Sequence, residues 1–202
     1  ELFLELGAAD CYEYSDRLPS VEELLPSVQN LEGQEVIILP NNPNILPTCQ
    51  LLSEHAQKSV YALHTANVVD GITAMYGYVD SSPAVENIRN MKDCIGLAET
   101  LHVFSSSRDA RVGGFRIPGG DFFVVRDGKV LSTSSSIQES VEAAMESIDI
   151  EGKSNVTCYY GNGFDAFELE QLKERISARY PAFQFDEHYG GQAHSLLIIA
   201  VE

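Results

Sequence analysis

The sequence predicts an α/β protein built from two subdomains, and three observations support this prediction. Short apolar runs alternate with helical patterns through residues 35–78, which is the order of strand-helix-strand-helix units. After residue 101 the pattern changes to short runs separated by glycine turns. Asp127-Gly128 then lies between two β-prone runs, as in a two-residue hairpin. Residues 1–80 are therefore expected to form a small doubly wound parallel sheet, and residues 81–202 a mixed α/β layer with an antiparallel hairpin.

In the first subdomain, local patterns predict each element in turn. The chain begins without Met, in a helical pattern that ends at Gly7, which favours a fragment of a longer protein. A capping box, Ser20 with Glu23, starts the next helix. The remaining elements are expected as strands at 11–14, 35–39 and 59–63 and helices at 44–56 and 68–78.

In the second subdomain, Ser82-Pro83 is typical of a helix start, and we expect that helix to run to about Leu101. The domain boundary is accordingly placed near Ser81. The elements that follow are expected as strands at 102–106, 115–117, 121–125, 129–132, 156–160, 183–186 and 195–201 and helices at 137–148 and 166–180.

The formal charge of −17 is concentrated at the two ends of the chain. Residues 1–35 hold nine acids and one base, residues 36–136 hold nine and eight, and residues 137–202 hold twelve and four. Such a charge disfavours nucleic acid, whose phosphates would be repelled. Solvated helix faces explain it most simply. The alternative is an acidic face for a basic protein partner, with five candidate residues at the two ends: Glu22, Glu23, Asp165, Glu168 and Glu170.

The four cysteines, at positions 11, 49, 94 and 158, form no Cys-x-x-Cys pair, and no histidine stands at metal-ligand spacing. Reduced thiols and a cytoplasmic location are the default expectation, with no metal site. No apolar run approaches the roughly 20 residues that span a bilayer, so we expect no membrane span.

Three asparagines follow the strand expected at 35–39, and they are candidate ligand-binding residues. Asn41, Asn42 and Asn44 stand at the carboxyl end of that strand, where open α/β sheets bind ligands. Their amides could hold a carboxylate or phosphate. In the structural alternative, Asn44 caps the next helix and the other two form an Asx-turn.

His64 ends the second expected strand and should lie beside the asparagine loop if the sheet is parallel. It is a candidate ligand contact, although a histidine without a carboxylate partner or nucleophile is more often a surface residue. Gly161-Asn162-Gly163 lacks the Lys and Ser/Thr of a P-loop. The sequence therefore offers no catalytic constellation.

Three stretches together carry a resemblance to a known family: Val36-Ile-Ile-Leu-Pro-Asn-Asn-Pro-Asn-Ile45, Gly120-Asp-Phe-Phe-Val-Val-Arg-Asp-Gly-Lys-Val130, and the ending from Gly190-Gly-Gln to Glu202. With them the chain resembles the C-terminal region of the A subunit of bacterial fatty acid kinase, a dihydroxyacetone-kinase-like (DAK phosphatase) family protein. It departs from the family pattern at Glu13–Ser20, where only Pro19 and Ser20 are kept.

The resemblance implies two subdomains similar to those of DegV-type fatty-acid-binding proteins. It places ATP, Mg²⁺ and phosphoryl transfer in upstream kinase and dimerisation domains, so that no cofactor is expected in this fragment. It also implies a DegV-type fatty-acid-binding partner, docked through an acidic groove so that its fatty acid can be converted to acyl phosphate.

Three functions remain open from the sequence. The first is a non-catalytic module that docks a DegV-type partner. The second is a small-molecule or acyl-chain-binding domain that uses the three asparagines and His64, which requires a deep apolar pocket beside them. The third is an enzyme that uses a cysteine or histidine.

Overall fold

The computed structural model describes residues 2–14, 17–192 and 195–202. The chain forms two compact units, Glu1–Ala98 and Glu99–Glu202. This division lies later than the boundary expected near Ser81. The reason is that the helix Ala84–Cys94 (α5) packs with the helix Val68–Tyr76 (α4) and belongs to the first unit.

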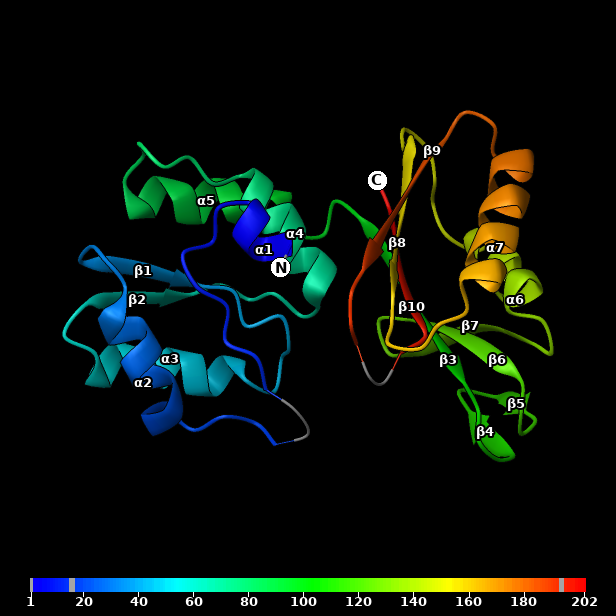
Figure 1. Cartoon of the computed structure of the whole chain (residues 1–202), viewed down its shortest axis with the longest axis horizontal. Helices are drawn as coiled ribbons and strands as arrows, with labels where there is room; N and C mark the ends of the chain where they lie inside the picture. The colour runs from blue at the N-terminus through cyan, green and yellow to red at the C-terminus, as the bar shows by residue number, and fades with distance from the viewer. Residues whose placement is uncertain (1, 15–16, 193–194) are drawn as a thin grey trace. The chain divides into compact units, whose positions relative to one another are not determined.

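The first unit is a two-stranded parallel sheet with helices on both faces (Figure 1). Its strands are β1 (Glu35–Ile38) and β2 (Ser59–Ala62), paired from Glu35 with Ser59 to Ile38 with Ala62. This confirms the parallel strand order predicted from the sequence. The remaining helices of the unit are α1 (Leu2–Glu5), α2 (Val21–Asn30) and α3 (Leu46–His55).

Two clusters of apolar side chains explain why helices cover both faces of this sheet. Val36 and Val60 pack with the buried side of α2 and α3, around Leu52. Ile37 points the other way and joins the cluster formed by Leu63, Ala74 and Met91. Because successive strand side chains alternate between faces, a strand that is apolar at consecutive positions is stable only when both faces are covered.

The second unit is a six-stranded mixed sheet in the order β7-β6-β3-β10-β8-β9. All neighbours are antiparallel except β8 and β9, which are parallel. The strands are β3 (Glu99–Ser105), β6 (Phe122–Arg126), β7 (Lys129–Ser134), β8 (Asn155–Tyr160), β9 (Gln184–Tyr189) and β10 (Leu197–Val201). A separate hairpin, β4 (Ala110–Val112) with β5 (Phe115–Ile117), lies beyond the ends of β3 and β6 (Figure 1).

The predicted hairpin turn at Asp127-Gly128 is confirmed. It joins β6 to β7 with Arg126 opposite Lys129, and both turn residues have positive φ, 50° and 74°. Two other expectations are wrong. Residues 11–14 form no strand, and the helix expected to reach Leu101 ends at Cys94, because Gly96 turns the chain with φ 82° and β3 begins at Glu99.

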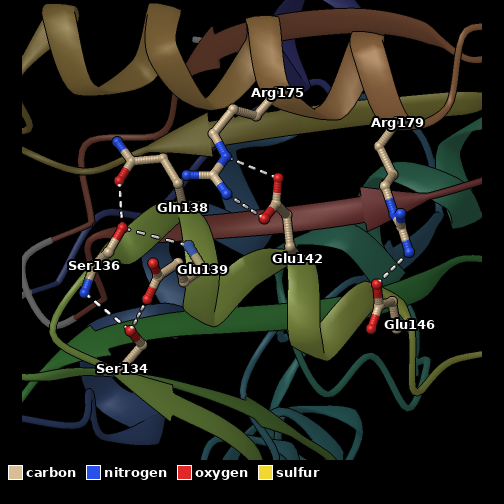
Figure 2. Close-up of polar contacts among 8 residues, drawn as sticks. All are labelled: Ser134, Ser136, Gln138, Glu139, Glu142, Glu146, Arg175 and Arg179. Carbon is tan, nitrogen blue, oxygen red and sulfur yellow. Dashed lines mark hydrogen bonds and ion pairs between the residues drawn. The ribbon is translucent and has the colours of Figure 1, made fainter.

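Two helices, α6 (Ile137–Met145) and α7 (Ala166–Arg179), cover one face of the second sheet (Figure 1). Their buried side chains form one core with alternate residues of the strands, including Val103, Cys158 and Ile199. The two helices are also joined by polar pairs at a constant spacing of 33 residues, Glu142 with Arg175 and Glu146 with Arg179 (Figure 2). A constant spacing requires parallel helices in a fixed register, so these pairs determine which side of α7 faces outward.

Candidate functional site

The asparagine loop connects β1 to α3 and is held by hydrogen bonds across the first unit. The Asn41 N–H donates to Thr65 Oγ1 at 2.8 Å, which joins the loop to the segment after β2 as a parallel sheet requires. Asn42 Oδ1 accepts from the Asn44 N–H at 2.9 Å, and its amide nitrogen donates to the Tyr14 hydroxyl at 3.0 Å. Asn42 therefore forms the Asx-turn predicted as the structural alternative.

Asn44 does not cap the helix that follows. The N-cap residue of α3 is Ile45, without a side-chain cap, and Pro47 occupies the first turn, where a missing N–H costs no intrahelical bond. The expected cap at Asn44 is therefore wrong, because the Asx-turn of Asn42 already ends the loop one residue earlier. The Asn44 side chain is exposed.

Asn41 is the unusual member of the loop. It has φ 55°, a conformation that asparagine tolerates better than most residues. Its Oδ1 is buried and accepts no hydrogen bond from any residue within the described ranges. A buried polar atom without a partner costs roughly 1–3 kcal/mol, so the position of this atom against Gly71 is a local cost to the stability of the fold.

Beside this loop the first unit has a cavity of about 780 Å³ that is open to solvent. Its lining is mainly apolar and comes from α2, β1, α3 and α5 and from the segment around Tyr12, with Val28, Leu52 and Met91 among the most buried side chains. Asn41 lines it, whereas Asn42, Asn44 and His64 do not. The second sequence hypothesis requires a deep apolar pocket beside the three asparagines and His64, and of these four residues only Asn41 lines this cavity.

His64 is exposed, and two of the four cysteines, Cys49 and Cys158, are buried. The His64 side chain is exposed and makes no hydrogen bond or ion pair with another described residue. Burial raises the pKa of the Cys49 thiol to about 11 and raises that of Cys158 as well. Neither thiol is a ready nucleophile, because the thiolate is the reactive form. Within residues 2–14, 17–192 and 195–202, no three His, Cys, Asp or Glu side chains gather as metal ligands.

Four of the five acids predicted to contact a partner lie at helix starts. Ser20 and Glu23 form the predicted capping box of α2, in which Glu23 also pairs with Arg17. Asp165 is the N-cap of α7 and accepts from the Phe167 and Glu168 N–H groups at 2.7 and 3.3 Å. Carboxylates stabilise helix N-termini, so these acids have local structural roles. The acids of α2 belong to the first unit and those of α7 to the second.

α7 carries an exposed stripe of which only Glu170 was a candidate residue from the sequence. Phe167 is 70% exposed, and Glu170 and Glu174, three and seven residues later, are exposed on the same side of the helix. The opposite side is buried through Leu172 and Ile176. We call Phe167, Glu170 and Glu174 the outer stripe of α7. Helical periodicity could have shown these three together, but it could not show that Phe167 stays uncovered.

Comparison with known proteins identifies the family. The model of a family described as the C-terminal part of proteins like the A subunit of fatty acid kinase (FakA-like) matches residues 1–202. The chain belongs to this family. Its relatives include Protein YloV of Bacillus subtilis, 27% identical over 203 residues, and an uncharacterized protein of Staphylococcus aureus strain USA300, 23% identical over the same length. The match covers all of this chain but only 37% of either relative, so the chain corresponds to a part of those longer proteins.

Solved structures confirm the DegV-like and dihydroxyacetone-kinase-like fold. The dihydroxyacetone kinase from C. freundii matches with TM-score 0.66 and 13% identity, over 91% of this chain and 42% of that one. The Streptococcus pneumoniae fatty acid kinase B3 protein, loaded with linoleic acid, matches with TM-score 0.65 and 14% identity, over 92% and 76%. A DegV family protein from Eubacterium eligens, loaded with heptadecanoic acid, gives 0.65 and 8%, over 92% and 78%.

Among the described residues, no helix is long and apolar enough to cross a bilayer.

Proposed function

We propose that this chain is a non-catalytic docking module of a fatty acid kinase A subunit. It binds a DegV-type fatty-acid-binding protein through an acidic surface, so that upstream domains, which hold ATP and Mg²⁺, phosphorylate the fatty acid of that partner. Family membership supports the kinase context.

The observation that carries the proposal is the outer stripe of α7. Aromatic side chains are enriched in protein interfaces and supply a large share of binding energy when a partner covers them. Phe167 stands exposed beside carboxylates, which is the arrangement of an apolar anchor with a charged rim. Burial of Leu172 and Ile176 on the opposite side of α7 holds this surface outward. The pairs with α6 lie on a neighbouring side of α7 (Figure 2).

The net charge of −17 supports the electrostatic half of the proposal. A field of one sign raises the association rate with a partner of opposite sign and imposes specificity more than affinity. We therefore expect association that is fast at low salt and slower as the salt concentration rises.

A titration with the DegV-type protein of the same organism tests this surface. The variant F167A/E170K/E174K should weaken binding by about 2 kcal/mol or more, since it removes the anchor and reverses two rim charges. Its fold should be retained, because all three side chains are exposed.

The matched charge control is E54K/E151K, which makes the same two charge reversals at exposed positions outside α7. If this control weakened binding as much as the α7 variant, only net charge would matter, and the outer stripe would not be the docking surface.

A second function, binding of an acyl chain or similar apolar small molecule, is favoured by the cavity of the first unit. Its volume of about 780 Å³ is in the range of small-molecule sites, and its lining is mainly apolar. Asn41 would supply a polar contact, since its amide offers both an acceptor and donors. Two proteins of the same fold are described as loaded with fatty acids.

Solvent extraction and mass spectrometry of the purified chain, followed by titration with a fluorescent fatty acid, test the second function. Ala84→Phe places a large side chain on the cavity wall and should abolish binding, whereas Ala178→Phe at an exposed position of α7 should not. Equal binding by the wild type and both variants would place the ligand elsewhere.

A further inference from the structure

The β4–β5 hairpin holds two arginines directly opposite each other. Arg111 and Arg116 are register partners, so their side chains leave the same face of the hairpin. The loop is Gly113-Gly114 with φ 58° and 89°, as a type I′ turn requires. In such a hairpin Val112 and Phe115 form the hydrogen-bonded closing pair, so the arginine pair is of the closer, non-hydrogen-bonded kind. Like charges directly opposite each other destabilise a strand pair.

The chain does little to neutralise this pair. Asp109 Oδ2 is 3.7 Å from Arg116 Nη2, and both side chains are at least 70% exposed. The Arg111 guanidinium has no hydrogen-bond or ion-pair partner in the part of the chain that the structure describes. The weak pairing of these arginines is not caused by a lack of acidic residues, since the sequence has 30 Asp and Glu and 13 Lys and Arg. Four other arginines are paired more closely with carboxylates, for example Arg126 with Glu99 at 2.7 Å.

The base of the hairpin is fixed while its tip is exposed. Ile117 is fully buried. Ser106 Oγ donates to the Arg108 carbonyl at 2.6 Å, and the Gly120 N–H donates to the Ser106 carbonyl at 2.7 Å. Val112, next to the glycine turn, is 43% exposed. The two guanidinium groups are thus presented on a preorganised arm, which lowers the entropy cost of binding.

The chemistry of this arm indicates its partner. Guanidinium groups bind carboxylates in a bidentate geometry and are enriched in protein interfaces. A projecting hairpin is convex, whereas small molecules bind in concave sites. Nucleic acid is disfavoured, because the chain carries −17 and the arm offers few phosphate contacts. We infer that the β4–β5 arm is a second docking surface, which inserts into an acidic groove of a partner protein with Arg111 and Arg116 on its carboxylates and Val112, on the opposite face of the hairpin, against an apolar wall of the groove.

This inference is independent of the proposed function, which uses an acidic surface and a partner of opposite charge. The test is an NMR titration of the chain with a short synthetic peptide of Glu and Leu residues. Saturable shifts of the backbone amides of residues 110–117 are expected. R111E/R116E should weaken binding of the peptide by about tenfold or more. R111K/R116K should weaken binding less, because Lys keeps the positive charge but cannot form the bidentate hydrogen bonds of a guanidinium group.

The matched control is R89E/K92E, which changes the net charge by the same amount at exposed positions of α5 and should leave the affinity unchanged. The single substitution R111E replaces the pair of like charges by a pair of opposite charges across the two strands. It should therefore weaken binding of the peptide without lowering the melting temperature of the chain. The inference is overturned if the wild type shows no saturable shifts at the arm. It is also overturned if the control R89E/K92E weakens binding of the peptide as much as R111E/R116E does. Tighter binding of the arm to a DNA oligonucleotide of equal charge would overturn it too.

Discussion

Asn41 and Gly71 fit together as a side chain and the space that it needs. A Cβ on Gly71 would lie 2.2 Å from Asn41 Oδ1, so α4 can approach the asparagine loop only with glycine at this position. Gly71 lies inside α4, where Ala would otherwise be favoured by roughly 1 kcal/mol. The glycine thus lowers the helix propensity of α4 but leaves room for Asn41 Oδ1, the one buried side-chain polar atom that lacks a partner within the described ranges.

Gly71→Ala should therefore destabilise the chain by about 1–2 kcal/mol, because the Asn41 amide must leave its place. In an Asn41→Gly background the same substitution should stabilise by up to about 1 kcal/mol, since glycine accepts φ 55° and leaves no side chain to displace. Chemical denaturation of the four proteins in this double-mutant cycle measures the coupling. Additive effects would show that the two residues do not constrain each other.

Asn42 and Asn44 should respond in opposite ways to alanine. Asn42→Ala removes the Asx-turn bond and the bond to Tyr14 and should cost about 1 kcal/mol. Asn44→Ala should stay within about 0.5 kcal/mol, because its side chain is exposed and does not cap α3. Denaturant unfolding measures the two costs: at equal dependence of the unfolding free energy on denaturant, the midpoints of the two variants can be compared directly. A cost of about 1 kcal/mol at Asn44 would restore it as a cap.

The capping box of α2 predicts a dependence of stability on pH. The hydrogen bond from Arg17, with a further bond from the Ser20 N–H, lowers the pKa of Glu23 to about 2 from its ordinary value of 4.5. A carboxylate with a depressed folded-state pKa contributes stability above its unfolded pKa and loses it as the pH falls. Between pH 4.5 and about 2, the wild type should thus lose its stability advantage over Glu23→Gln.

Thermal unfolding at a series of acidic pH values measures this difference. The control is Glu151→Gln, an exposed carboxylate of the second unit. A constant difference between the wild type and Glu23→Gln over the whole series would contradict the assigned role of the box.

The four thiols should divide into two pairs by reactivity. Burial raises the pKa of the Cys49, Cys158 and Cys11 thiols, but only Cys49 and Cys158 are buried from reagents, whereas Cys11 and Cys94 are half-buried. With an aromatic disulfide reagent under native, mildly alkaline conditions, two thiols should react promptly and two only after unfolding. Rapid modification of all four would show that the apolar clusters open easily.

Local patterns were enough to predict much of the fold. The apolar run through Val36 and Ile37 predicted a strand, and Asp127-Gly128 predicted its hairpin, because strand patterns and turn chemistry act over a few residues. The asparagine loop could be located in the same way. The Asx-turn at Asn42 was predicted as one alternative, but the sequence did not show that α3 begins after Ile45 instead of at Asn44.

The candidate sites depend on contacts that no local pattern contains. Asn41 and Gly71 are far apart in the sequence, and their fit appears only when α4 lies beside the loop. Arg111 and Arg116 become a pair only through the register of β4 and β5. Phe167 was expected in an amphipathic helix, but its exposure depends on the side of α7 that the pairs with α6 turn outward (Figure 2).

The most direct test of the docking proposal is calorimetric titration of this chain with the DegV-type fatty-acid-binding protein of the same organism, at low and at high salt. The proposal predicts a complex that weakens as salt rises and that F167A/E170K/E174K disrupts while E54K/E151K leaves it largely intact. No complex at either salt concentration would contradict it, and a fatty acid copurifying with the chain would then favour the cavity of the first unit as the functional site.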